Sequence, residues 1–301
     1  MILIYLIFFF LILRFTVTVF NFISNPKLTR SVREYDDFVS ILIPARNEEQ
    51  NILNLLESIK DQDYKHYEVI VLNDHSSDNT LALCRIFCES DSRFQVLQGK
   101  ALPKDWLGKN FACFQLANAA RGKYLIFLDA DETVANGLIN NSIHRMKLRG
   151  LSLLTLFTNQ VMLTLGERMV VPLMHFMLLN LLPLRLVSLS KSPAFSAASG
   201  QFMLFDAENY KKNQWHKQVK NRVVEDIEIM KLVKGFGYKG EALLANGFIF
   251  CRMYTNLEEA MNGFGKNLLA GFNNSVPGLF LYIFLVILGP IAMFGILSTE
   301  L

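Results

Sequence analysis

Short runs of apolar residues alternate with segments of helical periodicity through the middle of the chain. Ile52, Leu55, Leu56 and Ile59, for example, recur at the spacing of one helix face. Two of the apolar runs, Val39–Ile43 and Tyr67–Leu72, are rich in β-branched residues, as strands are. Phe94–Leu97 and Tyr124–Leu128 are the third and fourth candidate strands. Strands that alternate with helices predict βαβ units, and therefore an α/β fold with a mostly parallel sheet flanked by helices.

The chain starts with a long apolar segment. Residues 1–23 are apolar apart from Arg14, and this length is enough to cross a hydrocarbon layer of about 30 Å. The segment has no basic start and ends in bulky side chains, which favours a transmembrane anchor over a cleaved signal peptide. Lys27, Arg30 and Arg33 follow it, and by the positive-inside rule they predict a cell-membrane protein whose remaining chain is cytoplasmic.

Two further apolar segments lie in the second half of the chain. Residues 276–297 are uncharged and predict a second transmembrane helix, kinked at Gly289-Pro290. The few residues after it fit both a complete chain and one that continues into further spans. Met169–Leu189 contains prolines and predicts a helix at the membrane interface, with a buried helix as the alternative. Residues 256–275 are expected to form an amphipathic linker helix.

Composition narrows the class of protein. Hydrophobic residues make up 51% of the 301 residues and charged residues 19%, which is apolar for a soluble protein. A formal net charge of +3 without a long basic run argues against nucleic acid as a partner. The spacing of the four cysteines does not match that of a zinc site, and they are expected to be free, buried thiols in a reducing compartment. They are Cys84, Cys88, Cys113 and Cys251.

Polar residues stand at the ends of three of the predicted strands. They are Arg46–Glu48, Asn73-Asp74, and Asp129 with Asp131. The carboxyl ends of parallel strands share one edge of a sheet, where ligands bind, so a common pocket is expected there. Two carboxylates as close as Asp129 and Asp131 are costly unless a divalent cation and an anionic ligand balance their charge. The alternative is that Asp131 caps a following helix.

These motifs resemble those of the family 2 glycosyltransferases. The three blocks Pro44–Glu49, Val69–Thr80 and Phe127–Asp131 stand in the family's order, and the resemblance covers about Val39 to Arg252. A fourth block, Lys104–Lys109, is similar to membrane-anchored members that include carotenoid-acid (diaponeurosporenoate-type), ceramide and hopanoid glycosyltransferases. The resemblance implies a Rossmann-like GT-A domain over residues 36–255.

The resemblance also implies a site for a nucleotide-sugar donor. Pro44, Asn47 and Glu48 would line the nucleoside pocket. Asp74 would accept a hydrogen bond from the base, most naturally from the N3–H of uracil, which points to a UDP-sugar.

The resemblance assigns the diphosphate side of the site to three charged residues. Lys109 would lie near the diphosphate. Asp131 would bind Mg²⁺ or Mn²⁺ directly, with Asp129 directed towards the ribose or the water shell of the metal. The metal would neutralise the leaving nucleoside diphosphate.

A catalytic base is implied further along the chain. Glu225-Asp226 matches the family's Glu-Asp pair, whose Asp deprotonates the acceptor, so Asp226 is the candidate base of an inverting displacement. Without the family, capping of the following helix is about as good an explanation of Asp226. Gly200 and Gln201 fall where family members form the acceptor-side wall of the donor site.

One block departs from the family pattern. Many processive members carry Gln-x-x-Arg-Trp after the catalytic Asp, but Asn262–Asn267 takes that place here. This departure favours the transfer of a single hexose over processive synthesis. The membrane segments and the resemblance to carotenoid-acid enzymes imply a lipid-soluble acceptor, such as a carotenoid or another membrane lipid. The alternatives are a polyprenyl-phosphate sugar synthase and a non-catalytic nucleotide-sugar-binding membrane protein.

Overall fold

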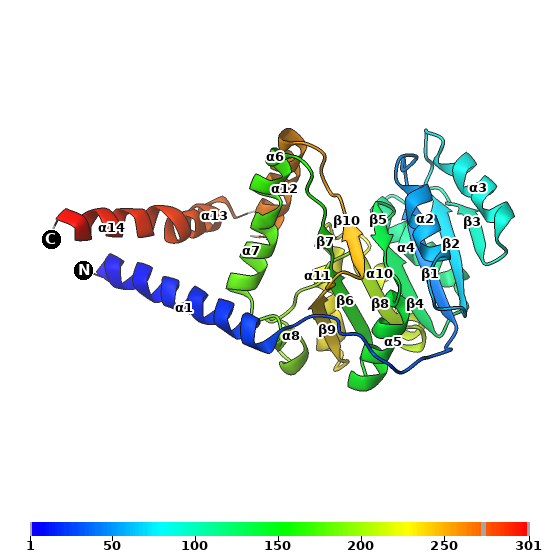
Figure 1. The fold of residues 1–301 in the computed structure, drawn as a ribbon, viewed down its shortest axis with the longest axis horizontal. Coiled ribbons are helices and arrows are strands. Elements are labelled where there is room, and N and C mark those ends of the chain that lie inside the picture. Colours follow the sequence, from blue (N-terminus) through cyan, green and yellow to red (C-terminus); the bar gives the residue numbers. More distant parts are fainter. Residues whose placement is uncertain (1, 272–274, 300–301) are drawn as a thin grey trace. The chain divides into compact units, whose positions relative to one another are not determined.

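The computed structural model (Figure 1) describes residues 2–271 and 275–299 and contains a seven-stranded sheet in the order β3-β2-β1-β4-β8-β6-β9. The strands are β1 (Val39–Ala45), β2 (Tyr67–Asn73), β3 (Phe94–Gln98), β4 (Tyr124–Leu128), β6 (Leu153–Phe157), β8 (Phe202–Asp206) and β9 (Gly240–Leu244). Strands β3, β2, β1 and β4 run parallel, and β6 is parallel to β9. Only β8 is antiparallel to its neighbours in this sheet, β4 and β6. The mostly parallel sheet predicted from the alternating pattern is thus confirmed.

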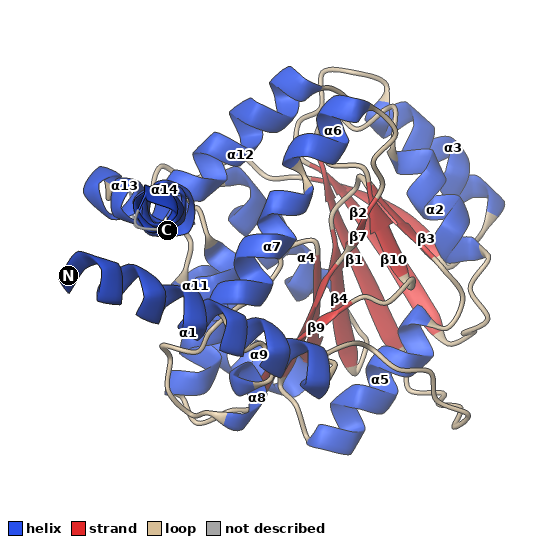
Figure 2. Ribbon diagram, turned by 60° about the vertical axis from the view of Figure 1, so that its left-hand side comes forward, coloured by secondary structure: helices blue, strands red, loops and turns tan. Residues whose placement is uncertain are grey.

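A smaller sheet and several helices complete this part of the chain. The second sheet has the order β5-β10-β7, with β5 (Glu132–Val134) antiparallel to β10 (Ile249–Cys251) and β10 parallel to β7 (Asn159–Gln160). Figure 2 shows helices on both sides of the strands. They are α2 (Ile52–Lys60), α3 (Thr80–Ser90), α4 (Gly108–Ala119), α5 (Leu138–Arg149), α8 (Leu186–Leu189), α9 (Ala207–Asn213), α10 (Trp215–Gln218) and α11 (Glu225–Gly235).

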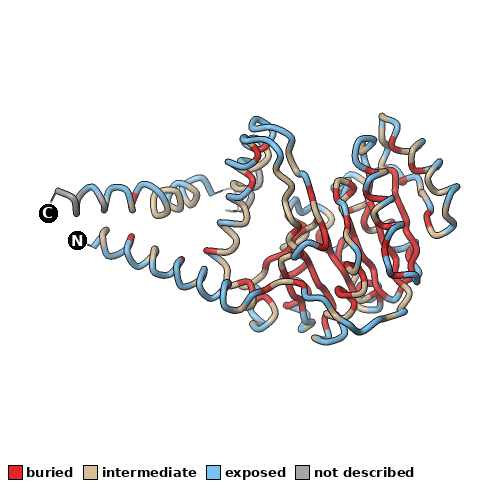
Figure 3. Tube along the Cα trace, in the orientation of Figure 1, coloured by how far each residue is buried: buried red, intermediate tan, exposed pale blue. Residues whose placement is uncertain are grey.

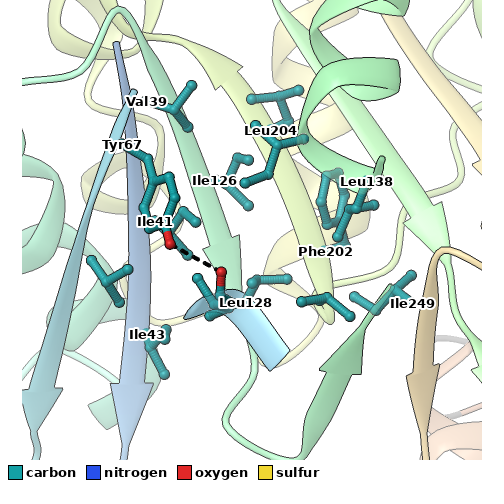
Figure 4. Packing of buried hydrophobic residues seen from close by; sticks show 14 of the residues in the cluster. Val39, Ile41, Ile43, Tyr67, Ile126, Leu128, Leu138, Phe202, Leu204 and Ile249 are labelled. Carbon is teal, nitrogen blue, oxygen red and sulfur yellow. Dashed lines mark hydrogen bonds between the residues drawn. The ribbon is translucent and has the colours of Figure 1, made fainter. Parts of the chain in front are cut away.

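The main core lies on one face of the large sheet. Side chains of a strand alternate between its two faces, and Ile41 and Ile43 of β1 face the same way as Ile126 and Leu128 of β4. Helices α2 and α5 contribute the opposing apolar side chains. Figure 3 shows the central strands of the large sheet almost entirely buried, and Figure 4 shows this packing from close by. Each fully buried aliphatic side chain stabilises the fold by about 1.5–3 kcal/mol.

A buried polar network fixes the register of β1 and β2. Ser40 lies opposite Glu68, and its hydroxyl donates to Glu68 Oε1 at 2.6 Å. Arg121 donates to Glu68 through its backbone N–H at 2.9 Å and through its guanidinium at 2.6 and 2.9 Å. The backbone N–H of Gly122 donates to Ser40 Oγ at 2.8 Å. The loop before β4 is therefore held against both strands.

The chain divides into two compact units. The sheet unit comprises Pro26–Val161 and Leu184–Met253. It begins before residue 36, because Leu28 is fully buried and donates its N–H to the carbonyl of Leu244 at 2.9 Å. The helical unit comprises Met1–Asn25, Met162–Pro183 and Tyr254–Leu301, apart from the residues outside the described ranges. Its helices are α1 (Ile2–Ser24), α6 (Leu165–Val170), α7 (Pro172–Leu181), α12 (Leu257–Gly271), α13 (Val276–Ile283) and α14 (Gly289–Thr299).

Arg14, the single charge in the first apolar segment, has a partner within the helical unit. Its Nε donates to Asn180 Oδ1 of α7 at 3.1 Å, and its guanidinium lies over the ring of Phe176 at 5.3 Å. Asn21 donates to the carbonyls of Leu179 and Leu182 at 2.7 and 2.8 Å, near the end of α7. Helix α1 therefore packs against α7 through polar side chains that lie within a mostly apolar helix.

Two helices are long and apolar enough to cross a membrane, by length and composition: Ile2–Ser24 and Val276–Met293. The second contains a π-helical turn at Phe284–Leu288, directly before Gly289-Pro290. Proline has no N–H to donate within a helix, and the wider turn accommodates this loss. The apolar segment Met169–Leu189 is divided among α6, α7 and α8. Its predicted place at the membrane interface stays a prediction.

Candidate active site

A cavity of about 480 Å³ opens at the carboxyl edge of the parallel strands. Strands β1, β2 and β4 are parallel neighbours, so the polar residues that follow them meet at this edge, as their positions in the sequence predicted. The cavity is lined by Pro44, Ala45, Arg46, Glu48, Asp74, Gly108, Lys109, Ala112, Asp129, Ala130 and Asp131. Of the predicted donor-site and metal-site residues, six therefore share one cavity: Pro44, Glu48, Asp74, Lys109, Asp129 and Asp131.

Lys109, in the first turn of α4, contacts two carboxylates. Its Nζ lies 2.7 and 2.8 Å from the two oxygens of Asp129, which follows β4, and 3.6 Å from Glu225 Oε1. Desolvation opposes the charged form of Lys109, but the charges of Asp129 and Glu225 outweigh it and raise the pKa of the ammonium. The positively charged ammonium group of Lys109 is thus fixed at the wall of the cavity.

Asp131 follows the same strand and does not cap a helix. The next element is the strand β5, which starts at Glu132, so the capping alternative for Asp131 is wrong. Burial, followed by the neighbouring charge of Asp129, raises the pKa of Asp131. Both carboxylate oxygens of Glu132 are buried, and no N–H or O–H group among the described residues donates to them. Two carboxyl groups, one of them unsatisfied, fit a divalent cation at this edge.

Glu48 lies on the β1 side of the cavity. Its Oε2 accepts from Asn51 Nδ2 at 3.0 Å. Burial is the main cause that raises the pKa of Glu48, and the charges of Asp131 and Asp129 add to the shift while the Asn51 hydrogen bond opposes it. Glu48 is therefore close enough to the two aspartates to be affected by any cation bound near them.

Asp74 and Asn47 differ in their relation to the cavity. Asp74 lines it, and Oδ2 lies 3.9 Å from Arg46 Nη1. Asn47 is absent from the lining residues: it has a left-handed backbone (φ 59°) and accepts from the N–H of Ser77 at 2.8 Å. It therefore holds the loop after β1 against the loop after β2, and its predicted contact with the nucleoside stays a prediction.

Asp226 lies in the first turn of α11, whose N-cap position is Val224. Its Oδ1 accepts from the N–H of Ile227 at 2.7 Å, and its Oδ2 accepts from the N–H of Gly200 at 2.9 Å. Burial raises the pKa of Asp226. The carboxylate is thus positioned by two backbone donors, one of them from the loop before β8.

Gly200 and Gln201 reach this edge because β8 is antiparallel to β4. The chain enters β8 where β4 ends, and the N–H of Asp129 donates to the carbonyl of Gln201 at 3.2 Å. A Cβ at Gly200 would lie 3.2 Å from Glu225 Oε1 and 3.3 Å from Lys109 Nζ. The side chain of Gln201 accepts from Thr158 Oγ1 at 2.8 Å, so its role as a binding residue stays a prediction.

Two residues at this edge received no role from the sequence. Glu132 directly continues the acidic run, which was a visible signal, and Cys251 was expected only to be a free, buried thiol. Cys251 is indeed free and buried, but its Sγ lies 3.5 Å from Asp131 Oδ2. Their proximity depends on the pairing of β5 with β10, which no local pattern reveals.

Known proteins resemble this chain in sequence and in fold. The 4,4'-diaponeurosporenoate glycosyltransferase of Staphylococcus haemolyticus (strain JCSC1435) is 28% identical over 269 residues, which are 87% of this chain and 69% of that protein. The mannosyltransferase PcManGT from Pyrobaculum calidifontis, solved with GDP-Man and Mn²⁺, is 14% identical with a TM-score of 0.60, covering 97% of this chain and 84% of that one.

A further solved structure shares the fold. Residues 1–349 of TarS from S. aureus give a TM-score of 0.50 at 17% identity, over 77% of this chain; the chain spans only 65% of that structure. Residues 40–212, more than half of the chain, match the family described as Glycosyl transferase family 2. The chain therefore belongs to the family 2 glycosyltransferases and is a glycosyltransferase of the GT-A fold.

Proposed function

We propose that this glycosyltransferase moves one hexose from a nucleotide sugar, a UDP-sugar, to a lipid-soluble carotenoid carboxylic acid. The observation that carries the proposal is the chain of contacts that joins the donor cavity to the candidate base. Lys109 contacts Asp129 in the cavity and Glu225 at the start of α11, and the next residue, Asp226, is held by Gly200. The sugar donor and the sugar acceptor would therefore meet at one connected set of side chains.

The donor half of the proposal rests on the lining of the cavity. Asp74 would accept from the base, Pro44 and Glu48 would flank the nucleoside, and Lys109 would attract the diphosphate as a point charge. Asp131 would hold Mg²⁺ or Mn²⁺, with Asp129 beside it. A bound cation supplies positive charge that stabilises the leaving diphosphate. The Mn²⁺ in the structure of the mannosyltransferase supports this choice of metals.

The transfer itself needs a group opposite the leaving phosphate. The acceptor oxygen forms a bond to the anomeric carbon as the bond from that carbon to the phosphate oxygen breaks, with inversion. Asp226 would take the proton of a hydroxyl acceptor. The relatives named for diaponeurosporenoate suggest a carboxylic acid instead. A carboxylate needs little base strength, so Asp226 would then mainly orient it.

Membrane attachment would bring the enzyme to such an acceptor. The two apolar helices support anchoring in the cell membrane, with the sheet unit in the cytoplasm. Within the helical unit, α6 and α7 expose the apolar side chains of Leu165, Met169 and Phe176. Such a surface suits a bilayer interface.

The test is sugar transfer by the detergent-purified chain. UDP- and GDP-sugars would be offered with Mn²⁺ or Mg²⁺ to a carotenoid acid, to a polyprenyl phosphate and to a total lipid extract. We expect metal-dependent label in the carotenoid from a UDP-sugar. Label in the polyprenyl phosphate alone would instead support the synthase, and donor binding without transfer to any lipid would support a binding protein.

A pair of variants on α11 tests the role of Asp226. Asp226→Asn should retain donor binding and lower turnover by roughly 10²-fold for a hydroxyl acceptor. Glu228→Gln is the matched control, because Glu228 lies on the same helix and pairs with Lys231 at 2.7 Å. Full turnover of a hydroxyl acceptor by Asp226→Asn would remove the base assignment.

A further inference from the structure

Glu132 and Cys251 form a cross-strand pair beside Asp131. They are directly opposite each other in the antiparallel pairing of β5 with β10, so their side chains share one face of the small sheet. Asp131 immediately precedes Glu132, and the Sγ of Cys251 lies 3.5 Å from Asp131 Oδ2. The ligand atoms of all three residues lie within 4.8 Å of one another.

The carboxyl group of Glu132 indicates that this cluster has a ligand. Glu132 is only 1% exposed, yet within the part of the chain that the structure describes its oxygens have no N–H or O–H donor, and only the weakly donating thiol of Cys251 is near. Buried polar groups in proteins nearly always have a partner, and an unpaired buried carboxylate is especially unfavourable. A cation between Glu132, Asp131 and Cys251 would satisfy it.

Asp129 is already engaged on the other side of the site. Both of its oxygens contact Lys109, at 2.7 and 2.8 Å. A cation on Asp131 therefore finds its nearest further donors in Glu132 and Cys251 rather than in Asp129. The three donors would comprise two hard carboxylates and one soft sulfur.

We propose that Asp131, Glu132 and Cys251 together bind the divalent cation, with the Cys251 thiolate as a direct ligand. The inference rests on the proposed function, because this cation is the one that accompanies the nucleotide-sugar donor. A thiolate among the ligands selects against Mg²⁺ and favours Mn²⁺, Co²⁺ and Zn²⁺ in increasing order of affinity. The site thus differs from an all-oxygen magnesium site in its metal preference.

The absorption spectrum of bound Co²⁺ identifies the ligand atoms without requiring sugar transfer. The full chain in detergent would be titrated with Co²⁺, with and without UDP, and the thiolate-to-cobalt charge-transfer band in the near ultraviolet recorded. We expect the band in the wild-type protein and in Cys88→Ser, a control at another free cysteine. Cys251→Ser should lose it, and Glu132→Gln should weaken Co²⁺ binding about tenfold or more.

The outcomes separate this inference from the proposed function. A wild-type protein that binds Co²⁺ without the band overturns thiolate ligation, whether or not the variants fold. A band that persists in folded Cys251→Ser does the same, while metal-dependent sugar transfer would leave the proposed function standing. Conversely, the expected cobalt spectra without transfer to any lipid would support the metal site and count against the transferase proposal.

Discussion

Lys109 lies between two carboxylates and offsets part of their negative charge. Without it, Asp129 and Glu225 would face the donor diphosphate as uncompensated negative charges. We therefore expect Lys109→Met to weaken UDP binding about tenfold or more, the equivalent of at least about 1.4 kcal/mol. Calorimetric titration with UDP measures this, with the exposed Lys104→Met from the preceding loop as the control. Equal affinities in both variants would contradict a role for Lys109 at the diphosphate.

The buried acids at the start of α11 predict a pH dependence. Burial raises the pKa values of Glu225 and Asp226, so the pair holds protons at a higher pH than exposed carboxyls do. A base must be ionised, and turnover with a hydroxyl acceptor should therefore rise as the pH increases through the apparent pKa of the pair and fall on acidification. Turnover measured against pH at saturating metal tests this. A wild-type profile that is flat from mildly acid to alkaline pH would exclude Asp226 as a base.

At the scale of elements, Glu68 links β2 to β1 and to the loop before β4. Burial opposes its ionisation, but hydrogen bonds from Arg121 and Ser40 outweigh burial and hold the pKa of Glu68 below its usual value. A lowered folded-state pKa contributes stability above the pKa of the unfolded chain, and this contribution is lost as the pH falls through the folded-state pKa. Glu68→Gln should thus cost about 1–3 kcal/mol of unfolding free energy at neutral pH.

Denaturant unfolding at neutral and at acid pH checks this prediction. The difference between wild type and Glu68→Gln should shrink in acid, because the wild-type carboxylate is then protonated as well. Glu89→Gln, at an exposed position of α3, should leave stability unchanged at either pH. If Glu68→Gln lowers the unfolding free energy equally at both pH values, the shape of the Glu68 side chain, and not its charge, would hold the register of β1 and β2.

The sequence predicted those elements whose signals are local. The apolar run Tyr124–Leu128 became β4 without change, and Val39–Ile43 became β1 with two more residues. The polar residues after these strands met at one edge because parallel strands require it. Cys251 could not be placed beside Asp131 in the same way, since the register of two strands far apart in sequence depends on tertiary packing. The position of Gly200 likewise depends on β8 being antiparallel to β4. The residues of β8 do not distinguish it from a parallel strand.

At the scale of the whole molecule, three segments distant in sequence combine into the helical unit. Arg14 and Asn21 of α1 bond to the region of α7, so the first apolar helix and the interrupted segment form one assembly. Helices α6 and α7 leave apolar side chains exposed, Met169 at 64% and Leu173 at 42%. An exposed apolar surface of this kind suits a membrane interface, which is where the proposed function places the lipid acceptor.

The double variant Met169→Glu/Leu173→Glu tests that role of the helical unit. Two carboxylates on α6 and α7 oppose insertion into the interface, so transfer to an acceptor embedded in vesicles should fall about tenfold or more. Flotation with the vesicles should persist, because the two long apolar helices remain, and UDP binding should be unchanged. Ile86→Glu, on α3 of the sheet unit and 67% exposed, is the matched control and should transfer sugar normally. Normal transfer by the double variant would mean that the acceptor does not arrive over α6 and α7, whereas a loss of UDP binding would show that the substitutions had damaged the fold instead.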